Sequence, residues 1–137
     1  MKLAATIRGV SSLEKKLAAL DLRPGFVRAL RESAILIHAT AVKSIQAHES
    51  QGRTYRRGST VHIASKPGHP PNTDTGRLVR SIKWEIDEAG LRARVGTDLD
   101  YGRDLEVKRD RPWLQPAYRK NRQEIRKLFG AVRAKTR

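Results

Sequence analysis

The chain contains no cysteine, which excludes disulfide bonds and thiolate metal sites. Aromatic residues make up only 5% of it, which is few for a protein that binds nucleic acid by stacking bases on aromatic side chains. No apolar run approaches the roughly 18 residues that span a bilayer, and the N-terminus lacks the apolar segment of a signal peptide. We therefore expect a protein that does not enter membranes and that is assembled in the cytoplasm.

Negative charge is also scarce. Lys and Arg number 29 and Asp and Glu number 14, so the net charge is +15 and the pI is about 11.1. Most acids lie in residues 85–110, which hold 8 acidic and 5 basic side chains, whereas residues 111–137 hold 1 and 9. This acidic band could pair with the basic end of a neighbouring subunit or with cations of its own subunit, and the sequence leaves both open.

Motifs for catalysis or cofactor binding are absent. The four histidines, His38, His48, His62 and His69, have no cysteine partner and no HExxH spacing. Asp98 and Asp100 could in principle hold a divalent cation, but a solvated or interfacial acidic band is the favoured interpretation. No P-loop, dinucleotide fingerprint or nucleophile elbow is present. We predict that the protein is not an enzyme and needs no cofactor or metal.

The length of 137 residues suits a single domain, 1–137, with one modest core. Residues 2–8 alternate between apolar and polar, which predicts a strand. Ser11 and Glu14 have capping-box spacing, which predicts a short helix over 13–20 that Pro24 ends. In residues 26–48 apolar side chains recur every three or four positions, which predicts a long helix.

The second half predicts a β-hairpin and a basic helix. Alternating apolar residues in 82–86 and 91–95 predict two strands, joined by a turn in which Gly90 takes the left-handed conformation. Asp74 or Thr75 is expected to cap a short turn over 76–79, and residues 101–107 are expected to add a strand. Pro116 is expected to be the first residue of the final helix, and residues 134–137 a flexible tail.

These elements predict an α+β fold, with a small antiparallel sheet and its hairpin packed against a long helix and a C-terminal helix. An extended basic loop, 51–74, separates the two halves, and weak alternation near Val61 predicts that part of it forms a protruding hairpin. The basic residues of this loop and of the last helix are candidates for contact with an acidic partner or with DNA. They are Arg53, Arg56, Arg57, Lys66, Arg119, Arg122, Arg126 and Arg133.

Two proline-containing segments carry the most specific pattern: PGHPPNTDTGRLVRSIKW over 67–84 and RPWLQPAYRKN over 111–121. In the first, Pro70, Pro71 and Gly76 are expected to set a turn. In the second, Pro112 and Pro116 bracket an aromatic residue, and Tyr101 and Glu106 are expected to orient the turn before it. The apolar residues of these segments are expected in the core or at an interface: Leu78, Ile82, Trp84, Trp113 and Leu114.

In order and spacing, these segments resemble the neck and tail-completion proteins of long-tailed phages, the gene-ten-like family of phage Hong Kong 97. The resemblance covers nearly the whole chain and includes SLEKKLAAL near the start and VGTDLDYGRDLEV in the middle. Two departures occur: Val107 and Lys108 stand where the family has an aromatic residue and a glycine, and Gly102 replaces a common alanine.

The resemblance implies an α+β subunit that forms a ring, of six-fold or twelve-fold symmetry, at the head–tail junction of the virion. It implies a structural role by binding alone, after assembly in the cytoplasm of the host bacterium. The implied partners are head-closure or connector proteins, tail-terminator or tail-tube proteins, and the genomic DNA in the channel. The alternative, based on charge alone, is a small basic nucleic-acid-binding protein, whose affinity for DNA would fall steeply with salt.

Overall fold

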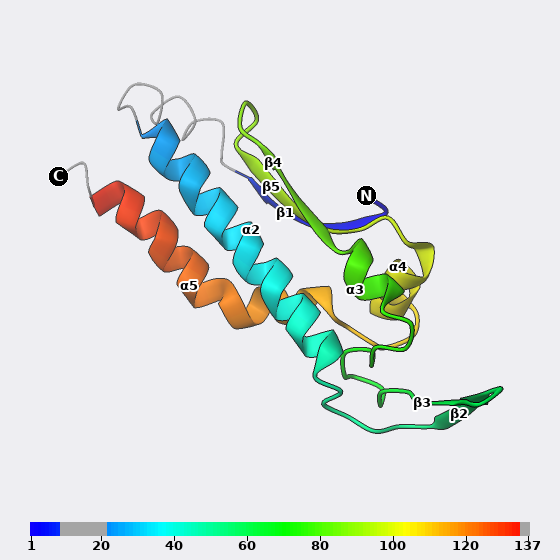
Figure 1. Cartoon of the computed structure of the whole chain (residues 1–137). Helices are drawn as coiled ribbons and strands as arrows, with labels where there is room; N and C mark the ends of the chain where they lie inside the picture. Colours follow the sequence, from blue (N-terminus) through cyan, green and yellow to red (C-terminus); the bar gives the residue numbers. More distant parts are fainter. Residues whose placement is uncertain (9–21, 135–137) are drawn as a thin grey trace.

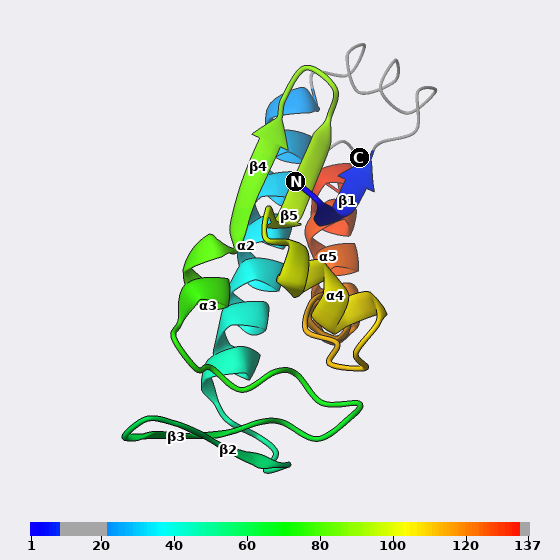
Figure 2. The same cartoon turned by 90° about the vertical axis from the view of Figure 1, so that its right-hand side faces the viewer.

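The computed structural model describes residues 1–8 and 22–134 and has an α+β fold. Two long helices lie side by side behind a small antiparallel sheet, and a second, two-stranded sheet projects from one end (Figures 1 and 2). The elements in chain order are β1 (Leu3–Arg8), α2 (Arg23–Gln46), β2 (Thr54–Arg57), β3 (Thr60–Ile63), α3 (Arg77–Ser81), β4 (Lys83–Asp87), β5 (Arg92–Thr97), α4 (Asp100–Val107) and α5 (Leu114–Ala134).

The main sheet has the order β1-β5-β4, so the last strand in sequence lies in its centre. Val95 of β5 pairs with Ala5 of β1 on one side and with Trp84 of β4 on the other. Alternate residues of β5 are buried because they face the helices, while Arg92 and Arg94 point to the opposite face. The strand over residues 2–8 and the hairpin after residue 82 are thereby confirmed.

The long helix α2 supplies much of the core. Its buried residues recur at three- and four-residue steps, as the apolar stripe predicted, and they are Phe26, Ala29, Leu30, Ser33, Ala34, Ile37, Ala41 and Ile45. Helix α5 runs antiparallel along α2, and the rings of Phe26 and Phe129 lie 5.0 Å apart near one end of the pair. The expected packing of the hairpin against a long helix and a C-terminal helix is confirmed.

Pro24 lies at the start of α2, and the helix over 13–20 that it was expected to end lies outside the described residues. Pro24 falls in the first turn of α2, where its missing N–H removes no intrahelical hydrogen bond. Pro116 likewise lies inside the first turn of α5, which begins at Leu114 and reaches Ala134. The predicted starts of the two long helices, at residues 26 and 116, were therefore wrong by two or three residues, because proline is tolerated at several positions of a first turn.

The expected strand over 101–107 is helix α4. Asp100 lies in its first turn, where a carboxylate is favoured by the helix dipole. Gly102 lies against the end of β5, and a Cβ added there would come within 2.8 Å of Thr97 Cγ2 and 2.9 Å of Leu78 Cδ1. This close approach, which no local pattern reveals, brings the helix down onto the edge of the core.

The turn between β4 and β5 uses a different residue from the one predicted. Leu91, not Gly90, has the left-handed backbone, with φ of 47°. Gly90 is required for space instead, because a Cβ would overlap the Asp87 carboxylate that accepts a hydrogen bond from its N–H. At α3, Gly76, with φ of 75°, occupies the N-cap position. Thr75 Oγ1 accepts a hydrogen bond from the Arg77 N–H at 3.4 Å, so Thr75 contributes a hydrogen bond at the start of this helix, as expected.

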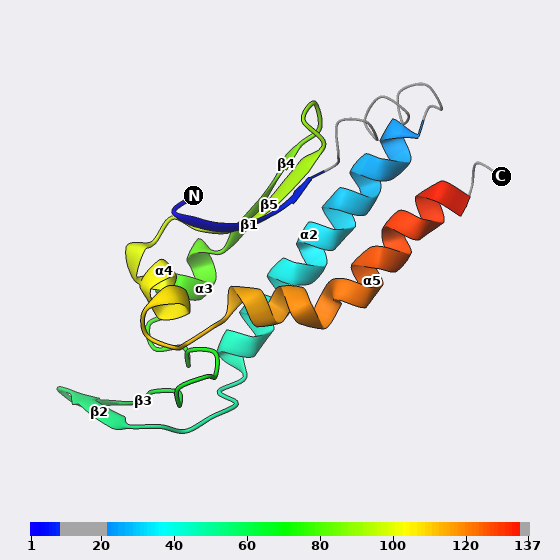
Figure 3. The ribbon, with the colours of Figure 1, turned by 180° about the vertical axis from the view of Figure 1, so that it is seen from behind.

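Residues 51–74 form the projecting hairpin β2–β3 and a return segment that lies against the body (Figure 3). The Asn72 amide donates hydrogen bonds to the carbonyls of Ser50 and Ile63, at 2.8 and 2.9 Å, and so ties both ends of the hairpin together. Arg111 Nε donates to the Ser65 carbonyl at 3.1 Å. The protruding hairpin is confirmed, and the rest of the loop is held by hydrogen bonds to the body.

The expected helix over 13–20 and the tail residues 135–137 lie outside the described residues, as does the side chain of Arg133. Within residues 1–8 and 22–134, no helix combines the length and apolar character needed to cross a bilayer.

Candidate functional site

Glu106 holds the junction between α4 and α5. Its carboxylate accepts hydrogen bonds from three successive backbone N–H groups: Trp113 at 2.6 Å, Leu114 at 3.0 Å and Gln115 at 2.9 Å. These groups stand at the start of α5, where N–H groups lack intrahelical partners. A carboxylate from another helix therefore caps α5 and fixes its direction relative to α4.

Trp113 anchors the same junction from inside. It is fully buried, and its Nε1–H donates to the Gly102 carbonyl at 2.9 Å. Gly102 in turn lies against Leu78, so the two proline-containing segments meet through α4. Tyr101, expected to orient this turn, lies instead beside α3 and is 40% exposed.

The remaining motif residues are placed as follows. Pro70 and Pro112 are partly buried, Pro71 is buried, and Ile82 and Leu114 belong to the core. Trp84, on the edge strand β4, is 37% exposed. Since no other described strand pairs with the outer side of β4, this edge of the sheet presents one large aromatic side chain beside backbone groups of an edge strand.

The acidic band is paired within the subunit. Most of its carboxylates have cationic partners: Asp98 with Lys83 and the Met1 amino group, Asp100 with Lys2, Glu88 with Arg31, Asp87 with Arg92, and Asp104 with Lys108. Glu106 binds the backbone of α5. These contacts favour intramolecular pairing over pairing between subunits, the two interpretations that the sequence left open.

These contacts also lower the pKa of several carboxyl groups. The pKa of Asp98 is lowered, first by the hydrogen bond from Lys83 and then by that from the Met1 amino group. A hydrogen bond from Lys2 lowers the pKa of Asp100. The pKa of Asp87 is lowered, first by the Gly90 N–H and then by Arg92. These partners favour the ionised form of each carboxylate, and Asp98 and Asp100 each pair with cations of their own subunit.

No cluster of three or more His, Cys, Asp or Glu side chains that could hold a metal occurs in residues 1–8 and 22–134. His38 Nε2 lies 3.1 Å from the Ile82 carbonyl, and His62 Nδ1 lies 3.8 Å from Asp74. The described residues offer exposed Lys and Arg side chains and apolar surface through which a partner could bind.

The outer face of α5 is the first basic surface. Arg119, Arg122 and Arg126 are exposed on it, together with Lys120 and Lys127. Of these, Lys127 lies 3.6 Å from Glu124, and the three arginines make no ion pair with another described residue. Since α5 turns its apolar side to α2, this face points away from the core.

The hairpin carries the second basic surface, at the end of the molecule opposite the C-terminal end of α5 (Figure 3). Arg53 lies over the Tyr55 ring, 5.5 Å from its centre. Arg57 pairs with Asp74 at 2.6 Å, whereas Arg56 and Lys66 are exposed. The seven predicted basic residues whose side chains are described therefore lie on two separate surfaces and do not form one patch.

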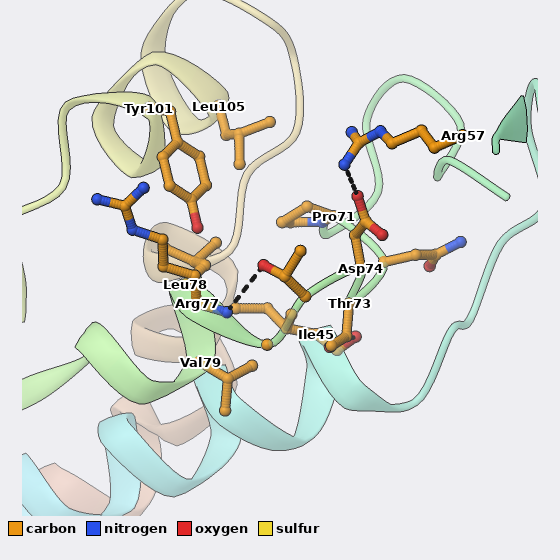
Figure 4. Close-up of a pocket in the computed structure, with 13 residues that line it drawn as sticks. Ile45, Arg57, Pro71, Thr73, Asp74, Arg77, Leu78, Val79, Tyr101 and Leu105 are labelled. Atoms are coloured by element: carbon orange, nitrogen blue, oxygen red, sulfur yellow. Dashed lines mark hydrogen bonds and ion pairs between the residues drawn. The ribbon is translucent and has the colours of Figure 1, made fainter. Parts of the chain in front are cut away.

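A groove, called here the hairpin groove, runs between the hairpin and α4. It consists of an α3 hollow of about 250 Å³ (Figure 4) and an arginine hollow of about 550 Å³. The two hollows adjoin, because both are lined by Arg57, Pro71, Asn72, Tyr101 and Leu105.

Sequence reasoning did not place Tyr55, His62, Arg109 or Arg111 in a binding site, although all of them line the arginine hollow. Arg109 and Arg111 follow α4 and come to lie beside a hairpin some fifty positions earlier in the chain. No sequence signal was available for this arrangement, because it depends on the helical form of α4 and on the fold of the loop.

Comparisons of the chain with protein-family models, with curated proteins and with solved structures found no match.

Proposed function

We propose that this protein is a structural virion protein of a long-tailed bacteriophage: a ring-forming neck, head–tail connector or tail-completion subunit that acts by protein–protein binding. The observation that carries the proposal is the order and spacing of the two proline-containing segments, 67–84 and 111–121. The proposal is supported by the contact of both segments with α4, because Gly102 of α4 packs against Leu78 of the first segment and accepts a hydrogen bond from the Trp113 indole of the second. A motif whose parts build one junction is suited to holding a fixed subunit shape.

The shape and charge of the subunit also suit assembly. A projecting hairpin and an exposed sheet edge are surfaces through which one subunit contacts the next. The acidic band is largely occupied within the subunit, so the basic surfaces are available to other partners. In a ring of six or twelve subunits these surfaces would face neighbouring ring proteins or the DNA in the channel.

Electron microscopy of particles made without the gene tests the proposal. DNA-filled heads that accumulate apart from free tails, and that rejoin on complementation, are the expected result. Tail length then separates a neck role from a tail-end role. Normal, joined particles in the absence of the gene would contradict the proposal.

The outer face of α5 can be tested in the same system. The triple variant Arg119→Glu, Arg122→Glu and Arg126→Glu should fold normally, because these side chains are exposed, but should fail to enter virions. The matched control changes the same three residues to lysine, which keeps the charge. Normal incorporation of the glutamate variant would remove α5 from the interface.

A second candidate, a small basic nucleic-acid-binding protein, is favoured by the same α5 face, since an arginine stripe can follow phosphates. It requires that the isolated chain bind duplex DNA. The logarithm of the binding constant should then fall linearly with the logarithm of the salt concentration. The neck proposal expects weak binding to free DNA. A titration of labelled duplex DNA at two salt concentrations separates the two.

A further inference from the structure

The hairpin groove is built from parts of the chain that are distant in sequence. The hairpin forms one wall, α4 and the segment after it form the other, and the segment 71–79 closes the inner end (Figure 4). The hydrogen bonds from Asn72 and Arg111 fix the hairpin relative to the body. The groove is therefore a preformed surface.

The arginine hollow concentrates positive charge. Arg56 and Arg57 come from β2, and Arg109 and Arg111 come from the segment after α4. Among the residues that the structure describes, no carboxylate lines this hollow. Arg111 donates to backbone carbonyls and Arg57 is paired with Asp74. Arg56 and Arg109 are exposed and form no ion pair with another described residue. They leave two cations available to an incoming anion.

The α3 hollow has a different chemistry. Ile45, Leu78, Val79 and Leu105 give it an apolar lining drawn from three helices. Burial raises the pKa of Tyr101, so its phenol stays neutral and remains a hydrogen-bond donor at the mouth. Small-molecule pockets measure roughly 300–1,000 Å³, and a hollow of about 250 Å³ is better matched to one apolar side chain.

We propose that the hairpin groove receives an acidic peptide segment of another protein, with carboxylates in the arginine hollow and one apolar side chain in the α3 hollow. This inference rests on the proposed function, because the partner it describes is a neighbouring protein of the assembly. An acidic peptide with one apolar side chain can contact both the basic rim and the apolar inner end of the groove, whereas an anion without an apolar group can contact only the rim.

Two observations separate this partner from the other polyanions available. The α3 hollow is lined by four aliphatic side chains, Ile45, Leu78, Val79 and Leu105, and its carboxylate, Asp74, is already paired with Arg57. This lining accepts an apolar side chain, which a phosphate backbone does not carry. The acidic band of a second copy is also a poor occupant, since its carboxylates are hydrogen-bonded within their own subunit. An acidic segment of a different protein fits both observations.

The test uses the full chain and a fluorescein-labelled peptide that carries one leucine between two pairs of glutamates, with binding followed by fluorescence anisotropy at low salt. The groove variant is Arg56→Glu with Arg109→Glu. The matched control is Arg28→Glu with Lys43→Glu, which makes the same change in net charge at two exposed positions of α2, away from the groove and from the basic face of α5. Circular dichroism confirms that both variants fold.

We expect the groove variant to bind the peptide roughly tenfold or more weakly than the control variant, because two attractive charge pairs become repulsive. A peptide with alanine in place of leucine should bind several-fold more weakly to the unaltered chain. These two results together would establish the charged and apolar parts of the site.

Three results would overturn the inference. Peptide binding that falls equally in both variants would mean that net charge alone attracts the peptide. Tighter binding of a single-stranded oligothymidylate, lost in the groove variant, would assign the groove to nucleic acid. Self-association that disappears only in the groove variant would assign it to a second copy. Because the assay uses the isolated chain, its failure leaves the neck proposal standing, and failure of the virion experiment leaves the groove result intact.

Discussion

Replacing Glu106 with alanine removes the only described side chain that accepts hydrogen bonds from the start of α5. The three N–H groups of Trp113, Leu114 and Gln115 would lose their acceptor. Two of these residues are buried, so water replaces the carboxylate poorly. We expect a large loss of stability from a single substitution of a side chain that is itself only partly buried.

The magnitude follows from three contributions. Loss of a helix N-cap costs about 0.5–2 kcal/mol, and loss of a negative charge at a helix N-terminus costs about 0.3–1 kcal/mol. Leaving a buried N–H without a partner costs about 1–3 kcal/mol, and this overlaps with the cap. The expected decrease in unfolding free energy is about 3 kcal/mol, or roughly 10 °C in melting temperature for a chain of this size.

Urea denaturation followed by circular dichroism measures this decrease. Glu124→Ala is the matched control, because it removes one carboxylate from an exposed position whose partner, Lys127, lies 3.6 Å away. The control should change stability by no more than about 0.5 kcal/mol. A loss below about 1 kcal/mol for Glu106→Ala, or one equal to the control, would refute the claim that this carboxylate fixes the α4–α5 junction.

Three further predictions concern particular residues. Gly96→Ala should destabilise the protein by roughly 3 kcal/mol, because the new Cβ would overlap the Leu3 carbonyl and approach Ala4 Cα to 2.8 Å; an ordinary urea midpoint would contradict this. Gly130→Ala should instead stabilise it by about 0.5–1 kcal/mol, since this α5 glycine has no atom within 4 Å of the Cβ position, and lower stability would be the contrary result. Asp98→Asn should lower stability near neutral pH but not in acid. The pKa of Asp98 is lowered in the folded protein, chiefly by the hydrogen bond from Lys83. The ionised carboxylate therefore contributes fully to the free energy of unfolding above the ordinary pKa of 3.8, and this contribution is lost as the pH falls through the lowered, folded-state pKa. Urea titrations at about pH 6 and about pH 2.5 test this, and an equal difference at both would contradict it.

The elements that were predicted correctly are those with a local apolar period. In α2 the residues Phe26, Leu30, Ile37 and Ile45 repeat at helical spacing, and such a stripe is sufficient to define a buried helix. The hairpin β4–β5 was predictable for the same reason. Its strands alternate over enough residues to define one face toward the core.

The errors occur where a tertiary contact decides between local alternatives. The segment that forms α4 is short, and its apolar residues, Tyr101, Leu105 and Val107, are compatible with either a helix or a strand. In the helical form of α4, Gly102 packs against Thr97 at the end of β5. This contact joins two separate elements, so no local pattern predicts it. In the same way, Leu91 takes the left-handed conformation because the tertiary fit of the turn outweighs its intrinsic preference.

The sequence identified the basic residues of these surfaces but not how they are arranged in space. Arg56 and Arg57 were identified from loop composition, yet their neighbours Arg109 and Arg111 come from beyond α4. The role of Glu106 was predicted in outline, as a residue that orients the turn before Trp113. Its three backbone hydrogen bonds depend on a distance between helices that sequence spacing alone does not give.

The position of β1 has a consequence for the order of folding. Among the described strands β1 pairs with β5 alone, and the pairing of Ala5 with Val95 spans most of the chain. Closing so long a loop is entropically slow, whereas β4 and β5 are joined by a short turn and can pair early. During synthesis the first strand has to wait until β5 has left the ribosome. Until then β1 lacks its partner strand, and in this interval its backbone groups can pair with another nascent chain.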